Sequence, residues 1–214
     1  MIWLFLCALK NTFMKILVIG GNGTIGKTVV NHLENKHEVI IAGRTSGDFK
    51  VDISNSDSIN QLFSNIGMLD AIVNIAGDAK WDTFDNLREE DYYIGLRSKL
   101  MGQVNLVRLG RKNLNDNGSI TLSTGILADH PVKMTASAAM VNGGIHSFVQ
   151  AVALEMDRGI RVNVVSSGLV EASVEKYRDY FPGHNAIPMN KVVNGYVRSV
   201  EGAESGQVIR IYDH

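Results

Sequence analysis

Cysteine and proline are scarce in this sequence, which has one Cys and 3 Pro among 214 residues. A single cysteine, Cys7, rules out an internal disulfide and a cysteine zinc cluster. Cys7 also precedes the segment in which we expect the fold, so we expect no cysteine nucleophile. The six histidines include no pair at the spacing of a helical metal site, and we predict no metal centre.

The chain also has no large excess of either charge: it contains 21 basic and 22 acidic residues, and its formal net charge is −1. Such a chain has no basic surface for a phosphate backbone or an anionic membrane, so we expect neither nucleic acid nor membrane as a partner. Hydrophobic residues make up 45% of the chain, which is enough for a full core. The length fits one domain.

Long apolar runs are also absent. The run Ile2–Leu9 is far shorter than the ~20 residues of a membrane-spanning helix, and it lacks the basic leading region and cleavage site of a signal peptide. We therefore expect residues 1–13 to be an extension, with Met14 as the natural start and one domain over residues 14–214. The alternative is a short tail that binds a membrane surface or a partner. We expect the protein to be cytoplasmic.

Short β-branched runs alternate with longer segments of helical periodicity, the pattern of βαβ units around a parallel sheet. This predicts an α/β fold of Rossmann type: a doubly wound parallel sheet of about seven strands with helices on both faces. The expected strands are Lys15–Ile19, Glu38–Ala42, Phe49–Asp52, Leu69–Ile75, Ser119–Leu122, Ile160–Val165 and Gln207–Tyr212. The expected helices are Ile25–Asn35, Ser56–Asn65 after a polar cap region, Asp91–Asn113 before a polar turn at Asn115–Gly118, Thr135–Met156, and Lys191–Val200 after a variable segment, Glu171–Pro188.

A glycine-rich segment directly follows the first expected strand and opens the first expected helix. Gly20, Gly23 and Gly26 lie at G-x-x-G-x-x-G spacing. Without side chains, this backbone can turn tightly and approach a pyrophosphate, whose charge meets free amides at the helix N-terminus. The segment indicates a dinucleotide site, and the alternative is an ordinary strand-to-helix turn.

The end of the second expected strand bears on the choice between NAD and NADP. An acidic residue there accepts a hydrogen bond from the ribose 2′-hydroxyl, whereas arginine accommodates a 2′-phosphate. Arg44 occupies this place with no carboxylate beside it, and Asp48 lies several residues further into the loop. We therefore expect NADP(H) to be preferred over NAD(H). The alternative makes Arg44 a solvated loop cation.

Further segments carry motifs from Met14 to nearly the C-terminus. They are Asp52-Ile53, Asn74–Gly77, Gly118–Gly125, and Gly159–Val165 followed by Ser166-Ser167-Gly168. Together with the glycine loop they resemble the short-chain dehydrogenase/reductase family. In that family the corresponding segments contact adenine, steady the fourth strand near the cofactor, carry the active-site serine and form the sixth strand, although Ser-Ser-Gly here replaces the usual Pro-Gly turn. The resemblance implies that residues 14–214 form one NAD(P)-binding domain.

The catalytic residues of that family are altered in this chain. In family enzymes a Tyr supplies the proton, a Lys four residues later holds the ribose, a Ser orients the carbonyl, and an Asn anchors a water relay. Counting along the matching segments places Ala138 at the Tyr position and Asn142 at the Lys position. Thr124, preceded by Ser123, takes the Ser position, and Lys99 takes the Asn position.

Any proton for the reaction must then come from water, from Lys99, or from a hydroxyl of the variable segment such as Tyr177. Lys99 is either a replacement acid or ribose contact, or a solvated helix cation. Tyr177 is either a displaced donor or part of the lid packing. Asn142 retains the ability to hydrogen-bond the ribose or the nicotinamide amide.

Two functions follow from these motifs. The first is an oxidoreductase that transfers hydride between a nicotinamide and an unidentified carbonyl or alcohol, and the second is a catalytically silent dinucleotide-binding sensor or partner. The candidate catalytic residues are Thr124, Ser123, Lys99 and Tyr177. The candidate cofactor-binding residues are Gly20, Asn22, Gly23, Thr24, Ile25, Gly26, Arg44, Asp52, Ile53, Asn74, Ala76, Gly77, Asn142, Gly168 and Val170.

The two long expected helices resemble the interface helices of the family, which implies a homodimer or homotetramer. The apolar residues expected to face a partner are Leu96, Leu100, Val104, Val107, Phe148 and Val152.

Overall fold

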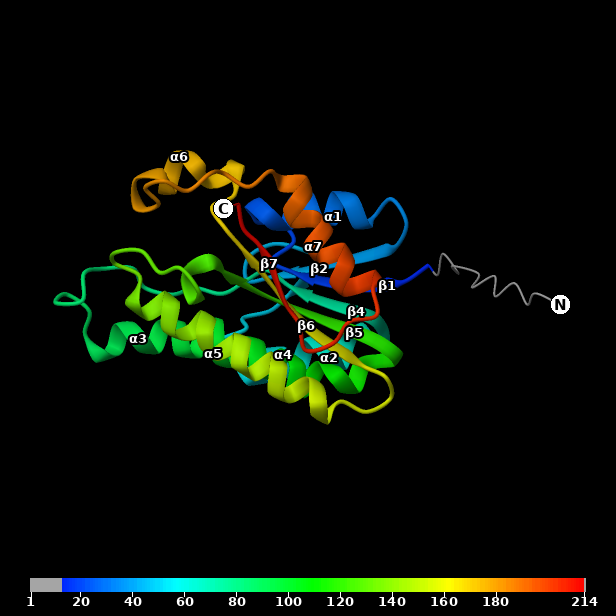
Figure 1. Cartoon of the computed structure of the whole chain (residues 1–214). Coiled ribbons are helices and arrows are strands. Elements are labelled where there is room, and N and C mark those ends of the chain that lie inside the picture. The colour runs from blue at the N-terminus through cyan, green and yellow to red at the C-terminus, as the bar shows by residue number, and fades with distance from the viewer. Residues whose placement is uncertain (1–12, 214) are drawn as a thin grey trace.

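The computed structural model describes residues 13–213. The extension predicted for residues 1–13 therefore lies outside the described residues, apart from Phe13, whose side chain is exposed. The described chain forms a seven-stranded sheet with helices on both faces (Figure 1). Every pair of neighbouring strands is parallel. This confirms the predicted α/β fold with a doubly wound parallel sheet.

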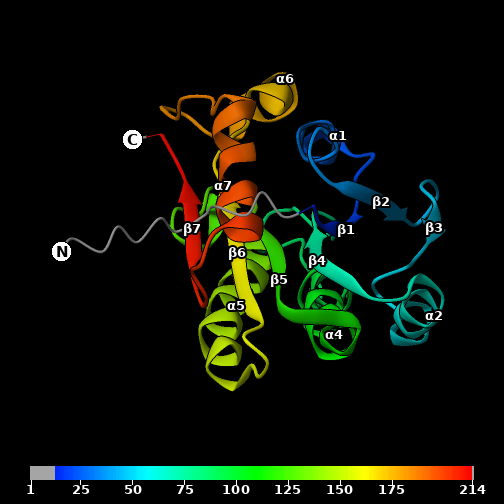
Figure 2. The ribbon, with the colours of Figure 1, turned by 90° about the vertical axis from the view of Figure 1, so that its right-hand side faces the viewer.

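The strand order across the sheet is β3-β2-β1-β4-β5-β6-β7, which Figure 2 shows from right to left. The chain leaves β1 toward β2 and β3, then returns to the other side of β1 for β4. In such sheets, ligands bind at the carboxyl ends of the strands where the order reverses. The strands are β1 (Lys15–Ile19), β2 (Glu38–Gly43), β3 (Phe49–Lys50), β4 (Leu69–Asn74), β5 (Leu114–Gly125), β6 (Arg161–Ser167) and β7 (Val208–Ile211).

The helices form a layer on each face of the sheet. Figures 1 and 2 show α1 and α7 on one face and α2, α4 and α5 on the other. Along β1, Ile16 and Val18 belong to the core under α1 and α7, whereas Leu17 and Ile19 belong to the opposite core. A strand buried on both faces reads as a continuous apolar run, which explains this sequence. The helices are α1 (Thr24–Leu33), α2 (Ser56–Ile66), α3 (Glu89–Gly95), α4 (Gly102–Gly110), α5 (Ala136–Val152), α6 (Val174–Tyr177) and α7 (Met189–Glu201).

The long helix predicted for Asp91–Asn113 is present as one continuous helical stretch, but its winding changes in the middle. A π-helical turn at Leu96–Met101 separates α3 from α4. A Cβ at Gly95 would lie 3.2 Å from Val141, and one at Gly102 would lie 2.9 Å from the Ile53 carbonyl oxygen. The two glycines thus pack against different neighbours, and the wider turn between them carries Lys99. Such turns are rare and often occur at functional sites.

The polar turn predicted at Asn115–Gly118 is part of β5 in the structure. The register between β4 and β5 shifts there, and Asn117 has a φ of 63°. The Asn117 amide donates to the Arg158 carbonyl oxygen at 2.8 Å. The segment is therefore an irregular start of the strand, because a long-range hydrogen bond holds it against the β6 side of the sheet.

The surface of α4 and α5 differs in part from the expected interface. Val107 is 1% exposed and belongs to the core, so it does not face a partner, and Leu100 and Phe148 also pack against that core. Met101 and Met140 are close to half exposed, and Leu154 is 89% exposed. In residues 13–213, no helix combines the length and apolar character needed to span a bilayer.

Candidate cofactor and active site

The glycine loop between β1 and α1 is shaped by close backbone contacts. Gly20 has a φ of +83°, a conformation that L side chains rarely adopt. A Cβ at Gly26 would lie 2.1 Å from the Gly20 carbonyl oxygen, so no side chain fits there. Gly23 is the N-cap of α1, and no side chain caps the first turn. The amides at the start of this helix therefore remain available to an anion.

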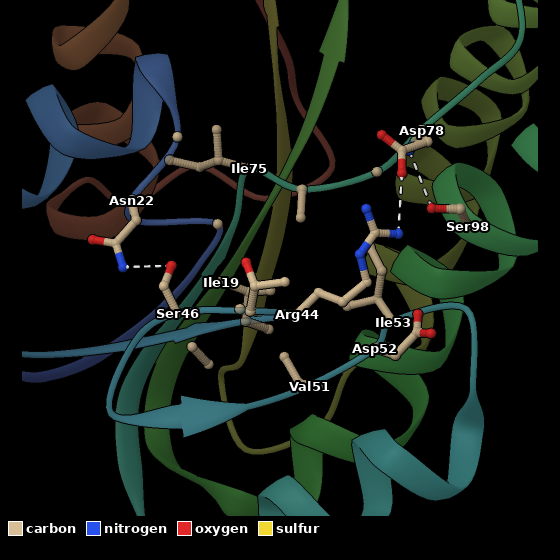
Figure 3. Close-up of a pocket in the computed structure, with 17 residues that line it drawn as sticks. Ile19, Asn22, Arg44, Ser46, Val51, Asp52, Ile53, Ile75, Asp78 and Ser98 are labelled. Carbon is tan, nitrogen blue, oxygen red and sulfur yellow. Dashed lines mark hydrogen bonds and ion pairs between the residues drawn. The ribbon is translucent and has the colours of Figure 1, made fainter.

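A cavity of about 420 Å³ opens at the carboxyl ends of β1, β2 and β4. The glycine loop forms one wall, and Figure 3 shows Arg44 reaching across the cavity from the end of β2. Asn22 Nδ2 donates to Ser46 Oγ at 3.0 Å, which ties the glycine loop to the loop after β2. The cavity includes these candidate cofactor residues: Gly20, Asn22, Gly23, Arg44, Asp52, Ile53, Ala76 and Gly77.

Two carboxylates near Arg44 have different roles. Asp48, the acidic alternative in the sequence, accepts a hydrogen bond from the Ile41 amide at 2.8 Å and so fixes the loop after β2. Asp78, which follows β4, places Oδ2 3.5 Å from Arg44 Nη1 (Figure 3). The expectation that no carboxylate lies beside Arg44 is therefore wrong, because the fold brings Asp78 next to the guanidinium. Asp78 belongs to a distant segment, so neighbours in the chain do not reveal the pair.

Asp52 and Ile53 lie together at the edge of the same cavity (Figure 3). Asp52 Oδ1 accepts hydrogen bonds from the Ser54 hydroxyl at 2.7 Å and the Ser54 amide at 2.9 Å. These bonds lower the pKa of the Asp52 carboxyl, and Arg44 lowers it further. An ionised carboxylate and the buried Ile53 side chain therefore stand where the family resemblance expects an adenine contact.

A second cavity of about 330 Å³ shares Gly77 with the first. It combines a polar wall with an aromatic and aliphatic one. The polar wall has Lys99, Thr124 and Asn142, and the apolar one includes Ala138, Trp81, Leu127, Leu169, Tyr177 and Phe181. Ile25, Gly168 and Val170, three of the candidate cofactor residues, line it as well.

Lys99 is not a solvated helix cation in this structure. A Cβ at Gly77 would lie 2.6 Å from Lys99 Cδ, so the lysine side chain passes directly against the segment shared by both cavities. Lys99 Nζ lies 3.4 Å from Ser123 Oγ. Burial lowers the pKa of Lys99 to about 8, while the nearby Asp78 acts in the opposite direction. The cavity thus contains a lysine whose ammonium loses its proton more readily than an exposed lysine does.

The residues at the altered family positions face the second cavity together. Ala138 and Asn142 lie four residues apart on one face of α5, and both are buried. Asn142 Nδ2 lies 3.5 Å from the Gly125 carbonyl oxygen at the end of β5. At these two places on the helix face the side chains are a methyl group and a carboxamide. Ala138 and Asn142 therefore both contribute to the wall of the second cavity.

Tyr177 lies in an aromatic cluster that covers the second cavity. Its ring centroid is 5.4 Å from that of Trp81 and 6.5 Å from that of Tyr180. Phe181 packs on Trp81 from the same segment, with centroids 6.5 Å apart. Tyr177 therefore contributes to the cavity wall as part of this packed aromatic cluster.

Four candidate residues lie outside the lining of both cavities: Thr24, Gly26, Asn74 and Ser123. Asn74 is fully buried, and its Nδ2 donates to the Ala76 carbonyl oxygen at 2.9 Å. Ser123 backbone groups are bonded to the Gln103 side chain. These two residues hold the strand ends that bear the site.

One further residue was missed by the sequence reasoning. His146 lies one turn beyond Asn142 on α5, and its Nε2 is 2.9 Å from Thr124 Oγ1. The spacing of residues 138, 142 and 146 on one helix face could have indicated it.

The switch-point cavity, the uncapped glycine loop and the adjoining polar cavity define a dinucleotide-binding α/β protein. A family model described as enoyl-(acyl carrier protein) reductase matches residues 23–201. The chain belongs to the short-chain dehydrogenase/reductase family, an oxidoreductase family.

Solved structures are similar over nearly the whole chain. The protein lin1944 from Listeria innocua is 46% identical, with a TM-score of 0.92 over 93% of this chain and 100% of that one. A small-chain dehydrogenase is 26% identical, with a TM-score of 0.81 over 94% of this chain and 97% of that one. A small-chain dehydrogenase in complex with NADPH is 25% identical, with a TM-score of 0.83 over the same shares. No match was found among curated proteins.

Proposed function

We propose that this protein is an NADP(H)-dependent oxidoreductase that transfers hydride between the nicotinamide and a carbonyl or alcohol substrate, using a non-standard set of residues. The observation that carries the proposal is the junction of the two cavities at Gly77. One cavity has the backbone and charge that a dinucleotide requires, and the other brings Lys99, Thr124 and Asn142 to an apolar chamber.

The residues present fit the cofactor. A side chain at Gly20 or Gly26 would collide with backbone, and the first turn of α1 is uncapped, so the loop suits a close-approaching pyrophosphate. Arg44 supplies a charge for a 2′-phosphate, and a relative of 25% identity forms a complex with NADPH. When bound, NADP(H) supplies or accepts the hydride.

The polar residues of the second cavity position the cofactor and the substrate. Lys99 contacts the ribose next to the nicotinamide, because its side chain lies at the junction of the cavities. Asn142 hydrogen-bonds the same part of the cofactor, and the Thr124 hydroxyl orients the substrate oxygen. The aromatic and aliphatic wall favours a substrate with an apolar body attached to its carbonyl.

The proposal is tested by cofactor titration followed by a substrate screen. NADPH and NADH are titrated against the protein by ligand fluorescence, and NADPH is expected to bind more tightly. The complex is then mixed anaerobically with a panel of carbonyls and quinones while NADPH absorbance is followed. Tight NADPH binding with no turnover of any compound would contradict the oxidoreductase and favour the silent cofactor-binding protein, whose support is the missing acid at Ala138.

We also propose that two or four copies associate through α4 and α5. The two helices are side by side on one face in both views (Figures 1 and 2), and the half-exposed Met101 and Met140 lie at the N-cap of α4 and on α5. Light scattering at micromolar concentration is expected to give a dimeric or tetrameric mass. A monomeric mass would contradict this proposal.

A further inference from the structure

We infer that His146 delivers the proton of the reaction through the Thr124 hydroxyl, in place of the phenol that Ala138 lacks. This inference deepens the proposed function and rests on it. It makes Thr124 the catalytic residue that touches the substrate oxygen, and His146 a positioning and relay residue behind it.

The first support is geometric. Thr124 Oγ1 and His146 Nε2 are 2.9 Å apart, and both residues are less than a tenth exposed. Thr124 lines the second cavity, whereas His146 does not. His146 therefore lies behind Thr124 as seen from the cavity, and a buried polar pair of this kind is shielded from competing water.

The second support is the hydrogen-bonding capacity of a hydroxyl, which has one proton and two acceptor sites. When His146 carries a proton on Nε2, it donates to Thr124 Oγ1. The Thr124 proton is then free to be donated to an acceptor in the cavity. The cavity side of Thr124 offers that place for a substrate oxygen, since Ala138 and Asn142 leave no other acid on this face of α5.

The proton balance of a carbonyl reduction is then complete. Hydride forms a new C–H bond at the carbonyl carbon, and the π electrons of the C=O bond move to oxygen. That oxygen takes the Thr124 hydroxyl proton, while Thr124 Oγ1 takes the Nε2 proton of His146. His146 begins as imidazolium, ends neutral and regains one proton from solvent in each turnover.

Charged groups near His146 shift the pKa of its imidazole. Burial lowers the pKa of His146, Asp129 raises it and Arg210 lowers it. Arg210 holds Asp129 through two bonds of 2.9 and 3.0 Å, and the Tyr212 hydroxyl donates to Asp129 at 2.6 Å. His130 packs on the Tyr212 ring, with ring centroids 5.9 Å apart, and Lys99 lines the cavity in front. The net lowering makes His146 a stronger acid, so activity falls as pH rises through its pKa.

The test compares His146→Gln, Thr124→Val and Thr124→Ser with the parent, and uses the exposed His32→Gln as a control. Glutamine keeps a donor but has no transferable proton. We expect His146→Gln and Thr124→Val to lower kcat on the screened substrate by about 10²-fold. NADPH affinity should be unchanged, and the fall in kcat with rising pH should disappear. Thr124→Ser should recover most of the rate lost in Thr124→Val together with its pH dependence, and His32→Gln should leave both unchanged.

A measurement without turnover accompanies the kinetics. The imidazole titration of His146 is followed by NMR in the protein without cofactor, its signal assigned by its loss in His146→Gln. We expect the pKa of His146 to lie below the ordinary histidine value. It should change in Thr124→Val and stay the same in Thr124→Ser.

The outcomes distinguish failure of the relay from failure of the oxidoreductase. Unchanged kcat and pH profile in a folded, NADPH-binding His146→Gln would overturn the relay and leave the oxidoreductase intact. If His146→Gln does not fold, an unchanged rate in Thr124→Val would overturn the relay in the same way. NADPH binding without turnover of any screened compound would overturn the oxidoreductase and the relay with it.

Discussion

Arg44 Nη1 and Asp78 Oδ2 form an ion pair of 3.5 Å across the mouth of the cofactor cavity. Both side chains are more than half exposed, so the pair itself adds little to stability. Its importance lies in its position, because the guanidinium that we assign to a 2′-phosphate already has a carboxylate beside it. An incoming phosphate must therefore share Arg44 with Asp78 or displace it.

Arg44→Asp should weaken NADPH binding by roughly tenfold or more, because a charge-assisted contact contributes roughly 1.5–3 kcal/mol. NADH binding should change little, since NADH has no 2′-phosphate. Both affinities are measured by fluorescence titration. The exposed Arg108→Asp on α4 serves as the matched control. Equal curves for NADPH and NADH on the parent protein would refute the preference.

Asp78→Asn should tighten NADPH binding relative to NADH by a few-fold. The substitution removes a carboxylate that competes for Arg44 and repels the phosphate. The backbone amide of residue 78 still donates its hydrogen bond to Ser98 Oγ. Isothermal titration of both cofactors at low and high salt checks this. The gain should shrink at high salt, because the charges are exposed. Weaker NADPH binding would show that Asp78 helps to hold the cofactor.

Lys99→Met should stabilise the fold at pH 7 by about 1–3 kcal/mol, because it removes a partly buried cation. The pKa of Lys99 is lowered from 10.5 to about 8, so between these values the unfolded chain binds more protons than the folded one. The stability of the parent therefore rises with pH through this window. Urea denaturation at pH 7 and pH 9.5 should show the advantage of the variant shrinking at the higher pH. A variant less stable than the parent at pH 7 would contradict this prediction.

Gly26→Ala should destabilise the protein and abolish cofactor binding, because the new Cβ would lie 2.1 Å from the Gly20 carbonyl oxygen. Gly143→Ala on α5 is the matched control, since a Cβ there meets nothing within 4 Å. In that helix interior, alanine should add about 0.5–1 kcal/mol of stability. Thermal unfolding and NADPH titration measure both effects. Normal binding by Gly26→Ala would mean that the loop does not hold the pyrophosphate.

In a His146→Gln background, Ala138→Tyr combined with Asn142→Lys should raise carbonyl reduction by up to about 10²–10⁴-fold, because a general acid contributes that much. Ala138 packs with Leu127, Leu169 and Phe181, so the larger ring should also cost about 1–3 kcal/mol of stability. NADPH oxidation with a simple ketone and thermal melts measure the two effects. Ala138→Phe with Asn142→Lys in the same background is the control without a hydroxyl. Equal rates in the two variants would show that the restored hydroxyl supplies no proton.

The fold and the cofactor loop could be predicted from the sequence because their determinants are local. Strands buried on both faces appear as apolar runs such as Lys15–Ile19, and the glycine spacing indicates where side chains are forbidden. Ala138 and Asn142, which the motif spacing selects as the altered catalytic pair, both line the second cavity. These features depend on neighbours in the chain, so periodicity and spacing suffice to read them.

Only the tertiary structure decided which distant groups meet. The Arg44 and Asp78 pair, the Lys99 side chain against Gly77, and the π-helical turn that carries Lys99 all depend on packing between separate segments. The Thr124 and His146 bond likewise joins a strand end to a helix face. Sequence alone determined the scaffold of a short-chain dehydrogenase/reductase, whereas the arrangement of polar groups in its second cavity is set by contacts that form only when the sheet brings its strand ends together.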